Sequence, residues 1–241
     1  SDISTSNLSE PRSKEGVKVI PFNYRRKATA EHMVRSKATS PHVLQAIEVD
    51  FSSVEKARKV IGQDWKEREG YSLSYLPFIA KAVCSAINDF PRVNGHIEND
   101  SLLIFDRVNL AIAIDLSFEG LVAPVIRDAD IKAVTEIARA IHDLAQRARG
   151  DSLGPDEFAN ATYTISNNGS FGTLITAPII NQPQIAILST DGVKKRPIVV
   201  QNGDEEAIAI RPVGILAQSF DHRGIDGSYS GAFLSRVKEI L

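Results

Sequence analysis

His222 stands in the segment QSFDHRGIDG (218–227), where an apolar run that predicts a strand passes into polar residues and then into a helix. A histidine at such a junction can lie at the edge of a cleft, with one ring nitrogen fixed and the other free to accept a proton. Because an ordinary imidazole pKa lies near ~6.5, this residue suits a general base for a thiol or a hydroxyl at neutral pH. The same pattern also fits a structural histidine or a surface cluster of ion pairs.

Ser166 lies in TYTISNNGSFG (162–172), where a predicted strand ends in a serine, two asparagines and a glycine. This places a hydroxyl, side-chain amides and a turn at one point, and donors held in this way can stabilise an oxyanion. An ordinary hairpin turn has the same composition, so the residues by themselves leave both interpretations open.

Other chemistry has weaker support. The glycine-rich stretch lacks the Lys-Ser/Thr of a phosphate-binding loop and the G-x-G-x-x-G pattern of dinucleotide sites, so we expect no nucleotide loop. The histidines and Cys84 show no metal-ligand spacing, so we expect no metal site, and Cys84 reads most simply as a buried hydrophobic residue on an apolar helix. A basic cluster could meet phosphates, although a solvated helix face is the simpler interpretation; it comprises Arg25, Arg26, Lys27, Arg35 and Lys37.

The composition is that of a globular protein with a substantial core. The chain has 241 residues, of which 43% are hydrophobic and 24% charged, and its net charge is −2. This charge gives no global field that favours nucleic acid or an anionic membrane. A single cysteine cannot form an internal disulfide, and no apolar run reaches the roughly 18–20 residues that span a bilayer. We therefore expect a reduced compartment, either a bacterial cytoplasm or a mitochondrial matrix.

Periodicity and turn residues predict the elements that must position these side chains. The order of the predicted helices and strands indicates one α+β domain over 17–241, with a mixed sheet flanked by helices. A flexible linker or arm is expected before it, over 1–16. Ser52 and Ser53 are candidate N-caps. The helices are expected at 24–38, 52–69, 74–89, 131–148 and 228–241, and the strands at 42–50, within 93–127, and at 162–167, 184–190, 196–201, 207–210 and 214–220.

Several segments together resemble the catalytic domain of the dihydrolipoamide acyltransferases, the core component of 2-oxo acid dehydrogenase complexes. DHRGIDG matches the family signature D-H-R-x-x-D-G, and TYTISNNGSFG is similar to T-[FI]-T-[IL]-S-N-x-G. Further matches, in order, are RRKATAEHMVRSKATSPH, FPRVNG, NLAIAID, GLVAPVIRDAD and APIINQPQIAIL. The resemblance covers nearly all of 17–241. It implies an α/β sandwich of the chloramphenicol-acetyltransferase type that assembles as trimers.

The resemblance also implies catalytic roles. His222 would be the general base that deprotonates the thiol of coenzyme A or of dihydrolipoamide, and the Ser166 hydroxyl would hydrogen-bond the tetrahedral oxyanion. Asp226 would organise the site, with Arg26 as an expected partner. In this family the histidine and the serine face each other across a trimer interface, so a monomer would lack a complete site.

Cofactor and partner expectations follow from the same resemblance. Coenzyme A is the expected substrate, and the lipoyl group is expected on a domain absent from this chain. The trimers would build a cubic or icosahedral core that binds the decarboxylase (dehydrogenase) and dihydrolipoamide dehydrogenase components, with no nucleic acid or membrane partner. The family's coenzyme A contacts map onto Arg58, Ser74, Asp115, Ser166, Asn167, Asp191 and Val193.

Two other functions stay open from the sequence. One is a free-standing acetyltransferase of the chloramphenicol type, against which the linker-like N-terminus and the S-N-x-G motif argue. The other is a non-catalytic core or binding subunit, which would be expected to lose the histidine of DHRGIDG. The acyl group is also open: SPHV resembles acetyl and branched-chain members, and SFGTLITAPIINQPQ resembles succinyl members. We expect acetyl or branched-chain transfer before succinyl.

Overall fold

The computed structural model describes residues 16–203 and 205–241. Residues 1–15, which make up most of the expected N-terminal arm, lie outside the described residues. The helices are α1 (Tyr24–Thr39), α2 (Ser52–Glu69), α3 (Leu76–Asp89), α4 (Val134–Arg149) and α5 (Gly227–Ile240). The strands are β1 (His42–Asp50), β2 (Gly95–Glu98), β3 (Ser101–Ile104), β4 (Leu110–Asp115), β5 (Leu121–Val122), β6 (Val125–Ile126), β7 (Tyr163–Asn167), β8 (Ala186–Thr190), β9 (Lys194–Asn202) and β10 (Glu205–Asp221).

The main sheet is mixed, as the sequence predicts. Its strand order is β1-β10-β8-β7-β4-β5, with β6 paired to β4 and β9 paired to β10. The pairs β4–β7 and β7–β8 are parallel, whereas the other pairs in the sheet are antiparallel. β2 and β3 form a separate two-stranded sheet. The predicted α+β architecture is therefore confirmed.

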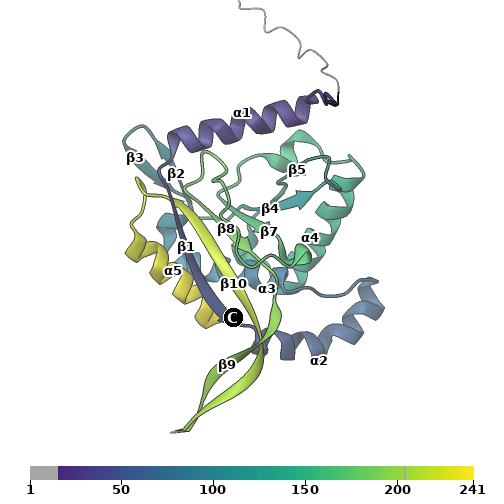
Figure 1. The fold of residues 1–241 in the computed structure, drawn as a ribbon, viewed down its shortest axis with the longest axis vertical. Helices are drawn as coiled ribbons and strands as arrows, with labels where there is room; N and C mark the ends of the chain where they lie inside the picture. Colours follow the sequence, from purple (N-terminus) through teal and green to yellow (C-terminus); the bar gives the residue numbers. More distant parts are fainter. Residues whose placement is uncertain (1–15, 204) are drawn as a thin grey trace, which may run out of the picture.

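The core forms where α3, α4 and α5 pack against the sheet. α3 presents Ala80, Val83 and Cys84 at 0% exposure, and α5 adds Phe233 at 0% exposure. Cys84 is buried as predicted, and burial raises the pKa of its thiol to about 12. In Figure 1, α1 lies along one end of the molecule, and the ribbon of β9 and β10 projects from the opposite end. None of the helices in the described part is long and apolar enough to cross a membrane.

The structure corrects one helix boundary, one predicted helix cap and one break between strands. The helix expected from residue 131 begins at Val134, because Ile131 belongs to a short 3-10 turn and is 65% exposed. Neither candidate serine caps α2: Ser52 is already helical, and the Asp50 carboxylate accepts hydrogen bonds from its backbone N and its hydroxyl.

The third correction concerns the last strands. The two strands expected at 207–210 and 214–220 are parts of one strand, β10. Arg211 and Pro212 suggest a break, because proline cannot donate to a sheet ladder. The strand nevertheless runs through, since Pro212 still pairs with Lys195 of β9 and its carbonyl accepts a hydrogen bond from Phe51 N at 2.8 Å.

Candidate active site

His222 lies immediately after β10, at the start of the turn that leads into α5. Its backbone N donates to the Pro41 carbonyl at 3.1 Å, which fixes the main chain beside the start of β1. The ring is 46% exposed, and its Nδ1 lies 3.7 Å from Asp226 Oδ1. The Asp226 carboxylate therefore lies on the Nδ1 side of the ring, and Nε2 is the nitrogen on the opposite side.

A buried carboxylate braces the same turn. Asp221 is 1% exposed and accepts hydrogen bonds from the backbone N of Arg223 at 2.9 Å and from its Nη2 at 2.7 Å. Burial by itself would raise the pKa of Asp221, but hydrogen bonds from Arg223 and Ser40 outweigh it, so the pKa is lowered. The Asp221 carboxylate is therefore charged at neutral pH and holds the chain on both sides of His222.

Ser166 lies on β7 and faces a pocket of about 390 Å³, here called the serine pocket. Side chains alternate along a strand, so Thr164 and Ser166 face this pocket while Ile165 lies in the core. The rest of the lining comes from α1, from β4 and the strand that follows it, and from the chain before β8; it comprises Thr29, His32, Met33, Ala113, Leu121, Ala123, Asn168, Thr176, Pro178, Ile179, Asn181 and Ile187.

The sheet register keeps His222 and Ser166 apart within one chain. Ser166 pairs with Ser189 of β8, and Ser189 pairs with Ala217 of β10. His222 comes five residues after Ala217, which is roughly 17 Å along the strand, and two strand spacings add roughly 10 Å sideways. The two side chains therefore belong to different places on the monomer, separated by roughly 19 Å.

A second buried carboxylate fixes the loop after Ser166. Asp191 is 4% exposed. Its Oδ1 accepts from the hydroxyls of Thr173 and Thr176, and its Oδ2 accepts from the backbone N of Thr176 at 3.1 Å and the hydroxyl of Ser189 at 3.2 Å. Four donors converge on this side chain. Asp191 thus ties the segment between β7 and β8 to the end of β8.

Four of the mapped coenzyme A contacts come together in a neighbouring pocket of about 330 Å³, here called the linking pocket. Ser74, Asn167, Asp191 and Val193 all line it. Because Asn167 follows Ser166 on β7, the linking pocket and the serine pocket lie on opposite faces of that strand. Both pockets reach its carboxyl end, where Asn168 lines the serine pocket and the adjoining glycine and Ser170 line the linking pocket.

The other three mapped contacts do not line that pocket: Ser166 faces the serine pocket, and Asp115 and Arg58 line neither of the two. Asp115, at the end of β4, accepts from the backbone N of Phe118 at 3.3 Å. Arg58 is engaged within the chain: its Nε donates to the Leu73 carbonyl at 2.8 Å and its Nη1 to Glu55 at 2.7 Å. Its guanidinium also lies 4.1 Å from the centre of the Tyr75 ring.

The sequence analysis missed a larger basic groove of about 740 Å³. Tyr75 and Val193 line both this groove and the linking pocket, so the two are continuous. Arg211 also lines the groove, and its Nε is buried with no hydrogen-bond partner among the described residues. The cationic side chains of the basic groove are Lys56, Lys59, Lys194, Lys195 and Arg211.

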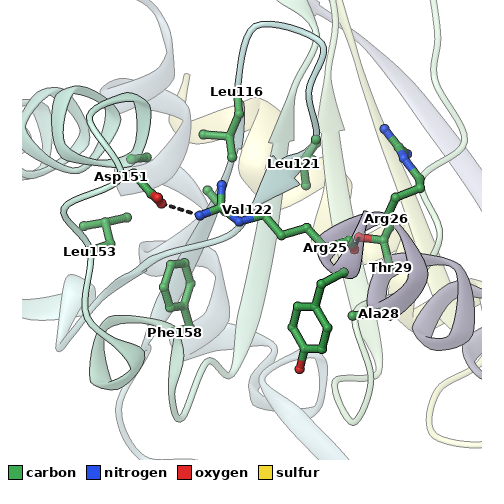
Figure 2. Close-up of a pocket in the computed structure, with 13 residues that line it drawn as sticks. Arg25, Arg26, Ala28, Thr29, Leu116, Leu121, Val122, Asp151, Leu153 and Phe158 are labelled. Carbon is green, nitrogen blue, oxygen red and sulfur yellow. Dashed lines mark hydrogen bonds and ion pairs between the residues drawn. The ribbon is translucent and has the colours of Figure 1, made fainter. Parts of the chain in front are cut away.

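A smaller pocket of about 290 Å³ lies beneath the first turns of α1 (Figure 2). Thr29 and Leu121 line both it and the serine pocket. Arg25 reaches across its mouth to form an ion pair with Asp151, while Arg26 points away from that pair. Among the described residues of one copy, Arg26 forms no ion pair with Asp226; the Asp226 carboxylate lies beside His222, with Oδ1 3.7 Å from Nδ1.

No group of three or more histidines, cysteines, aspartates or glutamates gathers as a metal ligand set within the part of the chain that the structure describes. The features of the described chain that could carry the site's chemistry are His222, Ser166, the serine pocket, the linking pocket and the basic groove.

Known proteins match this chain over nearly its whole length. Residues 14–241 match the family described as "2-oxoacid dehydrogenases acyltransferase (catalytic domain)". The lipoamide acyltransferase component of the branched-chain alpha-keto acid dehydrogenase complex of Bacillus subtilis is 40% identical over 97% of this chain and 54% of that protein. The dihydrolipoyllysine-residue succinyltransferase component of the 2-oxoglutarate dehydrogenase complex of Buchnera aphidicola is 34% identical over 95% of this chain and 55% of that protein. The chain thus spans about half the length of these relatives.

Solved structures match over nearly the whole described chain. A probable dihydrolipoamide acetyltransferase from Listeria monocytogenes has a TM-score of 0.89 and 38% identity, over 94% of this chain and 95% of that one. The dihydrolipoamide acetyltransferase of Azotobacter vinelandii has a TM-score of 0.87 and 29% identity, over 96% and 95%. The cubic core of a pyruvate dehydrogenase multienzyme complex has a TM-score of 0.87 and 28% identity, over the same shares.

A more distant match concerns the fold alone. Chloramphenicol acetyltransferase has a TM-score of 0.54 and 17% identity, over 88% of this chain and 94% of that one, in agreement with the expected architecture. The family match and the relatives above show that the chain belongs to the 2-oxoacid dehydrogenase acyltransferase family and corresponds to the catalytic domain of its members.

Proposed function

We propose that this chain transfers an acyl group between coenzyme A and dihydrolipoamide. One observation carries the proposal: the basic groove adjoins the linking pocket through Tyr75 and Val193, and the linking pocket and the serine pocket are lined by successive residues at the carboxyl end of β7. The groups of coenzyme A follow the same order, with phosphates at one end, a long neutral arm in the middle and a thiol at the other end. The phosphates would take the basic groove, the arm would take the linking pocket, and the thiol would reach Ser166.

The reaction begins when His222 Nε2 accepts the proton of the attacking thiol. The thiolate adds to the carbonyl carbon of the acyl thioester, and the Ser166 hydroxyl donates a hydrogen bond to the oxyanion that forms. The tetrahedral intermediate collapses, the carbon–sulfur bond to the other thiol breaks, and that sulfur takes the proton back from the imidazolium. The Asp226 carboxylate, 3.7 Å from Nδ1, would orient the imidazole ring. The Azotobacter vinelandii enzyme supports these assignments, since its catalytic mechanism has been investigated through a serine, a histidine and an asparagine, the asparagine four positions after the histidine as Asp226 is here.

A complete site then needs two copies of the chain. The separation of His222 and Ser166 along the sheet is too large for one proton transfer and one hydrogen bond to the same intermediate. A cyclic trimer would bring the His222 surface of one copy to the serine pocket of the next. The likeness to a cubic core supports further assembly of such trimers into a larger core, to which the dehydrogenase components of a 2-oxo acid dehydrogenase complex would bind.

The serine pocket favours an uncharged acyl group, acetyl or branched-chain rather than succinyl. The described residues that line it include no lysine or arginine, and its one histidine, His32, has a pKa lowered by burial and by Arg35. The Asp191 carboxylate stands behind Thr176 of the lining. A succinyl carboxylate would enter without a cation to pair with and near a like charge, which is unfavourable.

The lipoyl group would arrive on another domain. Relatives of this chain are about twice its length, which leaves room for such a domain outside the matched region. The dihydrolipoyl thiol would approach Ser166 from the side of the serine pocket, opposite the arm of coenzyme A.

Steady-state transfer from acetyl-, isobutyryl- and succinyl-coenzyme A to dihydrolipoamide tests the proposal. We expect transfer to dihydrolipoamide, a higher kcat/KM for the two uncharged acyl groups, and none to chloramphenicol. Transfer to chloramphenicol alone would favour a free-standing acetyltransferase, and binding of coenzyme A without turnover would favour a non-catalytic subunit.

A further inference from the structure

Glu55 is the only carboxylate among the described residues that line the basic groove. It lies in the first turn of α2, directly beside two of the groove's lysines, Lys56 and Lys59. The other charged side chains of the groove are all cationic, and an acidic side chain among them repels phosphates instead of binding them.

Glu55 contacts two residues of the groove lining, Tyr75 and Lys59, and also Arg58, which lies beside the groove. Its Oε2 accepts from Tyr75 OH at 2.6 Å and from Arg58 Nη1 at 2.7 Å. Its Oε1 lies 4.0 Å from Lys59 Nζ. The hydrogen bond from Tyr75 and the charges of Arg58 and Lys59 outweigh burial and lower the pKa of Glu55, so it is charged at neutral pH.

These contacts leave Arg58 little freedom to bind a second anion. Its Nε donates to the Leu73 carbonyl, its Nη1 donates to Glu55, and its flat face lies on Tyr75. Tyr75 in turn lines both the basic groove and the linking pocket. Glu55 thus pairs with Arg58 next to Tyr75, where the basic groove adjoins the linking pocket.

We propose that Glu55 is a resident anion of the basic groove, which pairs with Arg58 and Lys59 in the free protein and weakens the binding of the phosphates of coenzyme A. This inference rests on the proposed function, because it assumes that a polyphosphate enters the groove. A phosphate near these cations must share them with the carboxylate and stand close to its charge. Glu55 therefore limits the affinity for the nucleotide end, so that coenzyme A leaves readily after each transfer.

Glu55→Gln tests the proposal. Glutamine keeps an acceptor for Tyr75 and Arg58 but removes the charge. For a phosphate about 7 Å away at an effective dielectric constant of about 40–80, the lost repulsion corresponds to roughly threefold to sevenfold tighter binding. We expect the Kd of coenzyme A, measured by calorimetry, to fall by this factor, and the Kd of pantetheine, which has no phosphate, to stay unchanged. Added salt should narrow the difference between wild type and variant.

Glu67→Gln is the matched control, since it makes the same charge change on an exposed residue of α2 outside the groove. A Glu55→Gln protein that binds coenzyme A as weakly as wild type, or more weakly, would overturn the inference and make Glu55 a support for Arg58 alone. Equal tightening by Glu67→Gln would also overturn it, because the effect would then be one of net charge. Failure of the wild type to bind coenzyme A at all would instead overturn the proposed function, and the inference with it.

Discussion

Removal of the Asp191 side chain should loosen the loop that shapes the serine pocket. Four donors converge on this carboxylate, and Asp191→Ala removes the acceptor of all four hydrogen bonds. The Thr173 hydroxyl has an alternative acceptor in the Asn168 carbonyl at 3.3 Å, but the backbone N of Thr176 has none in the structure described. Three donors then lose their acceptor: the backbone N and the hydroxyl of Thr176, and the hydroxyl of Ser189. At about 1 kcal/mol for each, we expect a loss of about 3 kcal/mol in the free energy of unfolding.

Asp191→Asn separates hydrogen bonding from charge. Its amide can turn so that the oxygen accepts from Thr176 N and the Ser189 hydroxyl, while the NH₂ donates to the two threonine hydroxyls. Of the four donors, only the Thr176 hydroxyl then lacks an acceptor among the described residues, at a cost of about 1 kcal/mol. For a chain of this size, thermal unfolding should show a Tm about 6–12 °C lower for Asp191→Ala and about 2–4 °C lower for Asp191→Asn.

Asp64→Ala, an exposed change on α2, is the control and should stay near the wild-type Tm. Equal Tm values for Asp191→Ala and Asp191→Asn would refute the reasoning, because the four hydrogen bonds would then contribute nothing beyond charge.

Three further predictions concern the site. Ser166→Ala should lower kcat about 10²–10³-fold in steady-state assays with little change in KM, because its hydrogen bond forms in the transition state, and a change confined to KM would contradict that role. Lys59→Ala should raise the Kd of coenzyme A but not of pantetheine, whereas Lys66→Ala, at the far end of α2, should change neither. Asp221→Asn should lower the free energy of unfolding by an amount that depends on pH. The pKa of Asp221 in the folded state lies below its ordinary value of 3.8. The stability that the carboxylate contributes is therefore present above pH 3.8 and is lost as the pH falls through the folded-state pKa. Urea unfolding of both proteins should show a constant difference above about pH 5 that shrinks in acid, and a difference that grows in acid would be wrong in sign.

Local patterns predicted most of the elements, because their information is local. The apolar stripe of α4 and the alternation in β1 appear as a helix and a strand, and the family signatures around His222 and Ser166 lie where the sequence places them, at strand ends. Local rules failed at Pro212, where pairing with β9 and a hydrogen bond from Phe51 outweigh the break that proline suggests.

The site was only partly predictable, because its pockets depend on pairing between distant segments. The basic groove joins residues of α2 to residues of β9 and β10, and no local pattern places Lys59 beside Arg211. A lysine pair three residues apart on α2 and the adjacent Lys194 and Lys195 were the available signals. Arg58 is the opposite case, because the resemblance named it as a coenzyme A contact before its surroundings were known. Its hydrogen bonds to Glu55 and to the Leu73 carbonyl depend on the fold and could not be predicted from the sequence.

Complementation between two inactive variants tests the central claim, that one site is shared by two copies. His222→Ala and Ser166→Ala chains should each be nearly inactive, with losses of about 10²–10⁴-fold for the general base. Every mixed cyclic trimer contains one interface where an intact His222 meets an intact Ser166, so an equal mixture denatured and refolded together should recover roughly one quarter of wild-type activity. Folded proteins mixed without refolding are the control and should stay inactive. If mass spectrometry shows mixed trimers and activity does not return, the two residues act within one chain and the shared site is wrong.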